Sequence, residues 1–261
     1  TIGSERNFMK LSEHINNIKN NVNYRYTYVV AEIGINHNGD ISEAIKLIRA
    51  SKKTGCDAVK FQKRDLSSLY TDQILEDPNS AEWNFKYIIP ILQEVELSRS
   101  DYLQIKKECD LLCIDLIITP FDLESAQFCS TLNLDAFKIG SADMVNYDLI
   151  RECFSFKKPV IISTGMWTEE EIRNSVNEYK TFGDNDFFML LANSTYPTPY
   201  ESINLEFLAK LKLMHNLVGY SGHERGVFIP IAAPSLGARI IEKHITFDRA
   251  QSGPDHKASM L

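Results

Sequence analysis

Three short segments of the sequence combine charged residues with residues that can bind anions or metals. They are AEIGINHNGD at 31–40, KFQKR at 60–64 and GYSGHERG at 219–226. Each contains or follows a short apolar run, and a helical pattern follows the first and third directly. In a chain that repeats strand, loop and helix, such segments meet at the carboxyl ends of parallel strands, where barrel enzymes carry out their chemistry.

Lysines and small hydroxyl side chains recur at the ends of the apolar runs. Lys60 and Lys138 supply positive charge, while serine and threonine hydroxyls supply directional hydrogen-bond donors. The hydroxyl residues in these positions are Thr119, Ser141, Ser163, Ser194 and Ser221. This combination indicates a pocket for a phosphate or carboxylate group. A single lysine in a strand is more often a surface residue, so the prediction depends on the joint placement of these side chains.

Two histidines near the ends of the last two apolar runs, His223 and His244, are candidates to bind a divalent metal. Glu242 precedes His244 by two residues, so both side chains face the same side of a strand. With carboxylate and water neighbours, Mn²⁺, Co²⁺ or Mg²⁺ suits such a site better than a closed zinc site. Either histidine alone is more often a core residue with ordinary hydrogen bonds. His37 lies beside Asn38-Gly39, and we expect it to shape a turn.

The rest of the sequence predicts the elements that position these residues. Strands are predicted at 28–34, 57–62, 112–118, 135–140, 159–163, 187–192, 216–221 and 239–245. Helical patterns lie between them at 41–55, 98–110, 122–132, 147–155, 168–181, 203–213 and 227–237, with an irregular segment at 64–97. Eight strands on 261 residues favour an α/β fold of the (β/α)₈ TIM-barrel type over an open sheet. Residues 1–26 are predicted to be an N-terminal extension and 27–261 the barrel domain.

Composition narrows the class of protein. The net charge of −7 argues against a nucleic-acid partner, and no apolar run reaches the roughly 18 residues of a membrane span. Five cysteines, an odd number without a CxxC pair, are typical of free thiols in a reducing cytoplasm. No signal peptide is visible, so we expect a cytoplasmic protein that binds a small anion.

Eight motifs, in order, resemble those of the sialic acid (nonulosonic acid) synthases. They are AEIGINHNGD, KFQK, TPFD, KIGS, STGMW, STYPTPYE, GYSGHERG and IEKHITFDR…GPDHKAS, and they extend over residues 28–260. KFQK and GYSGHE are more similar to the animal-type branch. The resemblance implies a TIM barrel that condenses phosphoenolpyruvate with an N-acylated hexosamine, N-acetylmannosamine or its 6-phosphate, and releases phosphate. It also implies a homodimer and a C-terminal antifreeze-like domain, which we expect to be absent from this chain.

The resemblance assigns roles to individual residues. It implies metal ligands at His223 and His244, with Mn²⁺ as the expected metal. The implied phosphoenolpyruvate residues are Lys60, Thr119, Lys138, Ser141, Ser163 and Ser221. The implied sugar contacts are Glu32, Tyr196 and Asp255, and Glu242 is the implied water-handling carboxylate. Ser194 stands where some bacterial members have Asn.

Two other interpretations stay open at this point. A related phosphoenolpyruvate-dependent synthase of 3-deoxy sugar acids would share the barrel and the lysines but use another acceptor. A non-catalytic sugar-binding barrel would keep the fold without the reaction. Lys63 and Arg64 either bind a sugar phosphate or are ordinary solvated side chains.

Overall fold

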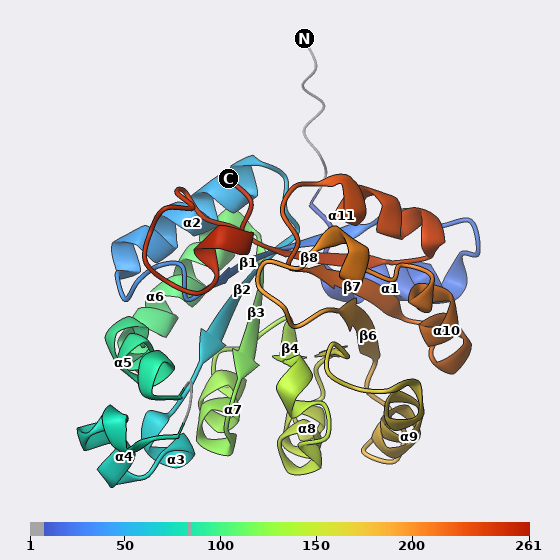
Figure 1. Cartoon of the computed structure of the whole chain (residues 1–261). Coiled ribbons are helices and arrows are strands. Elements are labelled where there is room, and N and C mark those ends of the chain that lie inside the picture. The colour runs from blue at the N-terminus through green and yellow to red at the C-terminus, as the bar shows by residue number, and fades with distance from the viewer. Residues whose placement is uncertain (1–7, 83–84) are drawn as a thin grey trace.

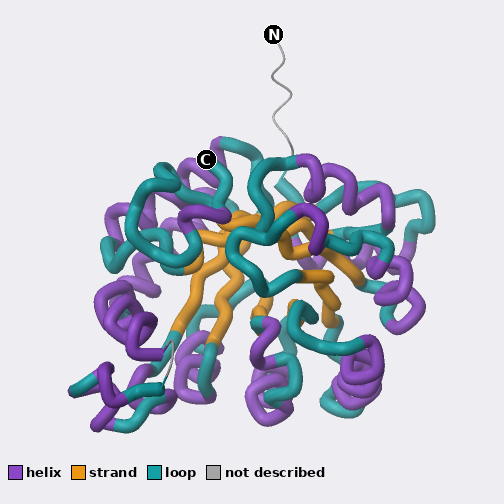
Figure 2. The backbone as a smooth tube through the Cα atoms, in the orientation of Figure 1, coloured by secondary structure: helices purple, strands orange, loops and turns teal. Residues whose placement is uncertain are grey.

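Eight parallel strands form a closed barrel in consecutive order in the computed structural model, which describes residues 8–82 and 85–261 (Figures 1 and 2). Helices surround the strands, so the predicted (β/α)₈ fold is confirmed. The strands are β1 Tyr28–Gly34, β2 Ala58–Lys63, β3 Asp115–Pro120, β4 Ala136–Ile139, β5 Val160–Ser163, β6 Phe187–Ala192, β7 Val218–Gly222 and β8 Ile240–His244.

The helices follow the predicted alternation with one long interruption. The α-helices are α1 Leu11–Asn20, α2 Ile41–Lys53, α3 Leu66–Leu69, α4 Asp72–Glu76, α5 Phe85–Val95, α6 Arg99–Leu112, α7 Leu123–Ser130, α8 Tyr147–Ser155, α9 Glu169–Tyr179, α10 Phe207–Met214 and α11 Phe228–Ala232. The short 3₁₀ turns are η1 Pro78–Ser80, η2 Ser141–Asp143, η3 Tyr200–Ser202, η4 Ala233–Leu236 and η5 His256–Ala258. The irregular segment that the sequence indicated between β2 and α6 holds α3, α4, η1 and α5.

Three predicted boundaries are wrong by three residues or more, for local reasons. The helix predicted at 203–213 begins only at Phe207, because hydrogen-bonded turns that start at Asn204 and Leu205 precede it. The third strand begins at Asp115, three residues later than predicted, because α6 continues to Leu112 and ends at Cys113 in the left-handed conformation (φ 49°). The last predicted helix, 227–237, is shorter. It is α-helical only to Ala232 and then tightens into a 3₁₀ turn that contains Pro234, which cannot donate the next helical hydrogen bond.

Strand register brings distant charged residues into one layer of the barrel. Glu32 on β1 is paired with Lys60 on β2 and with His244 on β8. On the other side of β8, Glu242 is paired with Ser221 on β7. Because side chains that share strand parity face the same side, register alone places the predicted site residues around one interior.

The predicted N-terminal extension, residues 1–26, contains α1 in its described part. Leu11 and Ile15 pack against strand residues such as Tyr28 and Val30 at the amino ends of the strands. Residues 1–7 of the predicted extension lie outside the described residues. The helix covers one end of the barrel, so the opposite end carries the opening.

The segment after β8 returns to the loop that follows β1. The Asn36 side chain donates hydrogen bonds to the carbonyl of Ile245 at 2.8 Å and to Ser259 Oγ at 2.9 Å. Ile245 also pairs with Met260 in an isolated bridge. In Figure 1 this red segment lies beside β1, β8 and α2, near the carboxyl ends of the strands. None of the described helices has the length and apolar character needed to cross a membrane.

Candidate active site

A cavity of about 250 Å³ opens at the carboxyl ends of the strands. Every residue predicted for the site lines it except Asp255. The predicted residues in its wall are Glu32, Lys60, Thr119, Lys138, Ser141, Ser163, Ser194, Tyr196, Ser221, His223, Glu242 and His244. Gln62, Phe121, Gly140, Ala142 and Met166 complete the lining. Residues separated by up to 212 positions in the sequence thus share one pocket, as the alternation of strands and helices predicts.

Lys60 is buried beneath the pocket and makes two polar contacts. Its Nζ lies 2.9 Å from Glu32 Oε2 and donates to Thr119 Oγ1, also at 2.9 Å. Burial alone would lower the pKa of Lys60, but the negative charges of Glu242 and Glu32 outweigh it, and the pKa is raised. Lys60 is therefore a stable positive charge that can attract an anion.

Lys138 is a second buried lysine with a weaker hold on its proton. Its Nζ donates to Ser163 Oγ at 2.7 Å and to the carbonyl of Ile139 at 2.8 Å. Burial lowers its pKa to about 8, although Glu242 opposes the shift. The nearby positive charge of Lys60 pushes the pKa in the same downward direction as burial. An anion placed between these two lysines would relieve that repulsion.

Glu242 is a buried carboxylate that remains ionised. Burial would raise its pKa, yet Lys60 and Lys138 together with a hydrogen bond from Ser221 lower it to about 2. That hydrogen bond joins Ser221 Oγ to Glu242 Oε1 at 2.8 Å. The pocket therefore carries a fixed negative charge between two positive ones, and an anionic ligand that pairs with the lysines would raise the pKa of Glu242 towards that of an effective base.

His223 and His244, at the ends of the neighbouring strands β7 and β8, both line the pocket, with ring centroids 5.5 Å apart. Nδ1 of His223 lies 2.7 Å from the Asn193 carbonyl, which fixes the ring, and within the described part of the chain no hydrogen bond engages its Nε2. Tyr196 covers the ring of His223 at a centroid distance of 4.0 Å. Burial and the neighbouring His244 lower the pKa of His223 to about 3, so its ring is neutral at physiological pH, as a metal ligand must be.

The donor set around the two histidines suits a metal only if other groups complete the coordination. Nδ1 of His244 is buried without a hydrogen-bond partner among the described residues, and Asp255 Oδ2 lies 3.7 Å from it. Within the described part of the chain, no three His, Cys, Asp or Glu side chains converge as a ready-made metal site. Two imidazoles therefore fit a divalent ion whose remaining positions belong to water and substrate.

Gly165 allows the hydroxyls of Ser141 and Ser194, called here the hydroxyl row, to approach each other in the pocket wall. The amide of Gly165 donates to Ser141 Oγ at 2.9 Å. A Cβ at Gly165 would lie 2.8 Å from Ser194 Oγ and 3.0 Å from Ser141 Oγ. Any larger residue would push these hydroxyls away, which explains why the STG motif carries glycine at this position.

Asp255 is in place although it does not line the cavity. Three polar side chains surround Gly34, whose backbone is in the left-handed region at φ 55°. A Cβ there would lie 3.0 Å from Glu32 Oε1, 3.1 Å from Gln62 Nε2 and 3.4 Å from Asp255 Oδ2. The segment after β8 thus brings Asp255 to the same side of the pocket as Glu32.

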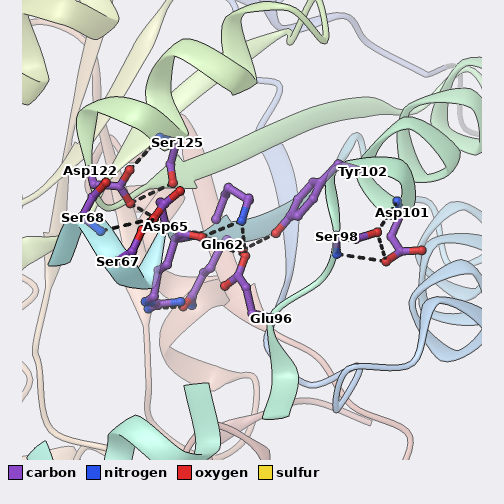
Figure 3. Close-up of polar contacts among 12 residues, drawn as sticks. Gln62, Asp65, Ser67, Ser68, Glu96, Ser98, Asp101, Tyr102, Asp122 and Ser125 are labelled. Atoms are coloured by element: carbon purple, nitrogen blue, oxygen red, sulfur yellow. Dashed lines mark hydrogen bonds and ion pairs between the residues drawn. The ribbon is translucent and has the colours of Figure 1, made fainter. Parts of the chain in front are cut away.

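Gln62 and Phe121 are wall residues to which sequence reasoning gave no role. Gln62 Nε2 donates to Glu32 Oε1 at 3.0 Å, and its backbone carbonyl accepts from the Tyr102 hydroxyl (Figure 3). Its shared strand parity with Lys60 was the available signal. Phe121 follows the Thr119-Pro120 pair at the end of β3, where an aromatic residue gave no such signal. His37 accepts a hydrogen bond from the amide of Gly39 at 3.1 Å, which confirms its expected role in a turn.

A (β/α)₈ barrel with buried lysines, a shielded carboxylate and paired histidines at its carboxyl end has the arrangement of an enzyme that binds anions. The model of the NeuB family matches residues 47–261. This chain belongs to that family, the sialic acid synthase family that its motifs resemble.

Named relatives agree with this assignment. The chain is 37% identical to the N-acetylneuraminate-9-phosphate synthase of Drosophila melanogaster, over 89% of the chain and 63% of that relative. It is 36% identical to the N,N'-diacetyllegionaminic acid synthase of Legionella pneumophila, over 97% and 73%. The crystal structure of the sialic acid synthetase of Leptospira borgpetersenii, in complex with citrate, superposes with a TM-score of 0.81 at 28% identity, over 90% of this chain and 78% of that one. The chain spans about two thirds of the length of several curated relatives.

Proposed function

We propose that this chain carries the active site of a synthase that condenses phosphoenolpyruvate with an N-acylated hexosamine to give a nonulosonic acid and inorganic phosphate. The observation that carries the proposal is the pocket itself, in which Lys60, Lys138, Glu242 and the pair His223 and His244 line one cavity. The names of the relatives support a nonulosonic acid product and differ in whether it is phosphorylated.

The lysines and hydroxyls suit phosphoenolpyruvate. Lys60 and Lys138 provide charge for its phosphate and carboxylate, and the hydroxyls of Thr119 and Ser163, already bonded to them, provide directional contacts. Held in this way, the enol carbon is presented to an acceptor that lies towards the histidines. Orientation of two reactants in one pocket lowers the entropic cost of their reaction.

The acceptor side contains Glu32, Tyr196, Asp255 and the histidine pair. Mn²⁺, with Mg²⁺ or Co²⁺ as alternatives, would be held by His223 and His244 and would supply Lewis acidity to a carbonyl oxygen. Glu32 and Asp255 offer acceptors for sugar hydroxyls, and Tyr196 offers an apolar ring face at the half-exposed rim.

The proposed bond changes balance without any further reactant than water. A carbon–carbon bond forms between the enol carbon of phosphoenolpyruvate and the acceptor aldehyde, and positive charge develops on the adjacent oxygen-bearing carbon. Glu242 stabilises that charge and orients water, which adds there. One proton of this water passes through Glu242 to the former aldehyde oxygen, which becomes a hydroxyl. The other proton leaves with phosphate as the C–O bond breaks and the ketone forms. Once the lysines are paired with the substrate, Glu242 accepts the proton of this water more readily.

Turnover tests the proposal directly. The purified protein is incubated with Mn²⁺, phosphoenolpyruvate and a panel of acceptors that includes N-acetylmannosamine, its 6-phosphate and arabinose 5-phosphate. We expect phosphate release that requires an N-acylated hexosamine. Release with arabinose 5-phosphate alone would identify a different 3-deoxy sugar acid synthase, and no acceptor-dependent release with any sugar would refute the proposal. Assembly as a homodimer stays a prediction, which sedimentation of the same sample checks.

A further inference from the structure

The two basic residues at the end of β2 have different environments. Nζ of Lys63 lies 2.5 Å from Glu96 Oε1 and donates to the backbone carbonyl of Arg64. Figure 3 shows Glu96 close to Gln62 and Tyr102, between β2 and the start of α6. The charge of Lys63 is therefore neutralised by the chain itself, and this residue is not available to a ligand.

Arg64 has no acidic partner among the described residues. The centre of its guanidinium lies 3.7 Å from the centroid of the Phe121 ring, and Nη2 donates to Gln62 Oε1 at 2.8 Å. Its Nη1 is buried and lacks a hydrogen-bond partner among the described residues, within which Arg64 also forms no ion pair. Burial lowers the pKa of the group, with Glu96 and Asp255 opposing, but an arginine stays charged at ordinary pH.

Both residues that hold this guanidinium are part of the pocket wall. Gln62 and Phe121 line the cavity, and Gln62 in turn donates to Glu32. Arg64 follows the end of β2 and lies four residues beyond Lys60, roughly 13 Å further along the strand direction. The guanidinium therefore lies against two residues of the pocket wall, Gln62 and Phe121, on the side of Glu32, and Arg64 does not itself line the cavity.

A buried, charged nitrogen without a partner is costly, and folded proteins rarely leave one unless a ligand completes it. Phe121 stacks on the guanidinium and Gln62 accepts a hydrogen bond from Nη2, so Nη1 is the nitrogen left without a partner among the described residues. A charged guanidinium N–H pairs more strongly with a phosphate oxygen than with a neutral hydroxyl.

We propose that Arg64 recognises a phosphate monoester at the far end of the acceptor sugar, so that this chain prefers a phosphorylated N-acylhexosamine to the neutral sugar. The inference rests on the proposed function and makes it more specific. Lys60 and Lys138 serve phosphoenolpyruvate deeper in the barrel, and Arg64 serves the acceptor.

The test compares specificity between N-acetylmannosamine 6-phosphate and N-acetylmannosamine. We expect the wild-type protein to have the higher kcat/KM for the phosphorylated sugar. In Arg64→Gln the ratio of the two kcat/KM values should fall by about 10- to 100-fold, as expected for loss of a charged hydrogen bond. Arg99→Gln is the matched control, because Arg99 stacks on Phe128 at 5.1 Å outside the pocket, and it should keep the wild-type ratio.

The outcomes separate this inference from the proposed function. If Arg64→Gln lowers kcat/KM equally for both sugars, Arg64 only supports Gln62, and the inference fails while the proposed function stands. A wild-type preference for the neutral sugar would also overturn the inference alone. If no sugar is turned over, the proposed function fails. Calorimetric titration with the sugar phosphate then still tests Arg64. Equal affinity of the wild-type protein and Arg64→Gln for this ligand would contradict the role of Arg64. Should Arg64→Gln not fold, Arg64→Lys, which keeps the charge and loses the fork, replaces it with the same expected direction.

Discussion

The two ends of the barrel bury charge in opposite ways. At the end covered by α1, Asp115 accepts hydrogen bonds from the Leu11 amide at 2.8 Å, the Tyr28 hydroxyl at 2.7 Å and Lys10 Nζ at 2.5 Å. The chain itself satisfies this carboxylate. At the open end, Nδ1 of His244 and Nη1 of Arg64 are buried without a hydrogen-bond partner in the described part of the chain.

This difference distinguishes a structural network from a binding site. Among residues 8–82 and 85–261, all buried side-chain nitrogen and oxygen atoms without a hydrogen-bond partner belong to residues at the carboxyl end of the barrel. These residues are Glu32, Asn36, Arg64, Glu224 and His244, of which Glu32 and Glu224 still have lysines as ion-pair partners. Folded proteins provide hydrogen-bond partners for nearly all buried polar groups. Buried polar groups that lack such partners at just one end of the barrel therefore indicate groups that bind ligands.

The histidine pair gives the largest expected effect. His244→Ala should reduce metal-dependent turnover by at least about 100-fold, because Lewis-acid assistance contributes several kcal/mol, while the melting temperature stays close to that of the wild type. Manganese binding measured by calorimetry should weaken in parallel. His215→Gln is the control, since its ring stacks on Phe187 outside the pocket. Full activity in His244→Ala would remove this residue from the site.

The deep lysine gives the next effect and a pH signature. Lys138→Met should raise the KM for phosphoenolpyruvate by about 10- to 100-fold through loss of a charged hydrogen bond. With a pKa of about 8 in the free protein, Lys138 is charged below that pH and neutral above it. The wild-type kcat/KM for phosphoenolpyruvate should therefore fall as pH rises through 8, and the variant should lack this fall. A flat wild-type profile up to pH 9.5 would contradict the assignment.

A substitution at the end of the barrel covered by α1 should change stability and leave turnover unchanged. Burial and the charge of Asp135 raise the pKa of Asp115 to about 6. A carboxyl with a raised folded pKa binds protons more tightly than in the unfolded chain, so its contribution to stability is present at low pH and decreases as pH rises through 6. The free energy of unfolding should change by on the order of 2 kcal/mol across that window, and Asp115→Asn should lack this change. Urea titrations from pH 4 to 8 measure it, and identical pH dependence in both proteins would refute it.

The smallest expected effect concerns the hydroxyl row. Gly165→Ala places a Cβ 2.8 Å from Ser194 Oγ and 3.0 Å from Ser141 Oγ, and short side chains such as these yield by rotating. We expect a KM for phosphoenolpyruvate several-fold higher and kcat nearly unchanged. The unfolding free energy should fall by about 1 kcal/mol, because the Cβ also lies 3.1 Å from the Ala192 carbonyl carbon. A variant with wild-type KM would show that Ser141 and Ser194 do not contact this substrate.

Regular alternation made the barrel and most of its site predictable from sequence. Strand parity located Lys60, Glu242 and His244, because a two-residue period decides which side chains face the interior. The same rule pointed to Gln62 without giving it a partner, since its contacts with Glu32 and Arg64 depend on side-chain rotamers. The different fates of Lys63 and Arg64 could not be predicted, because Glu96 lies 33 residues from Lys63 along the chain at the end of an irregular segment. The covering helix α1 was also not predicted, because its few apolar residues are buried only by contact with the barrel strands.

The fate of water oxygen tests the account most directly. The reaction is run in ¹⁸O-labelled water with Mn²⁺, phosphoenolpyruvate and the phosphorylated acceptor, and the released phosphate is read by the isotope shift of its ³¹P resonance. Water oriented by Glu242 adds to carbon, so we predict acceptor-dependent phosphate that carries no label. Labelled phosphate would mean attack at phosphorus and would contradict the arrangement of Lys60, Lys138 and Glu242 described for this pocket.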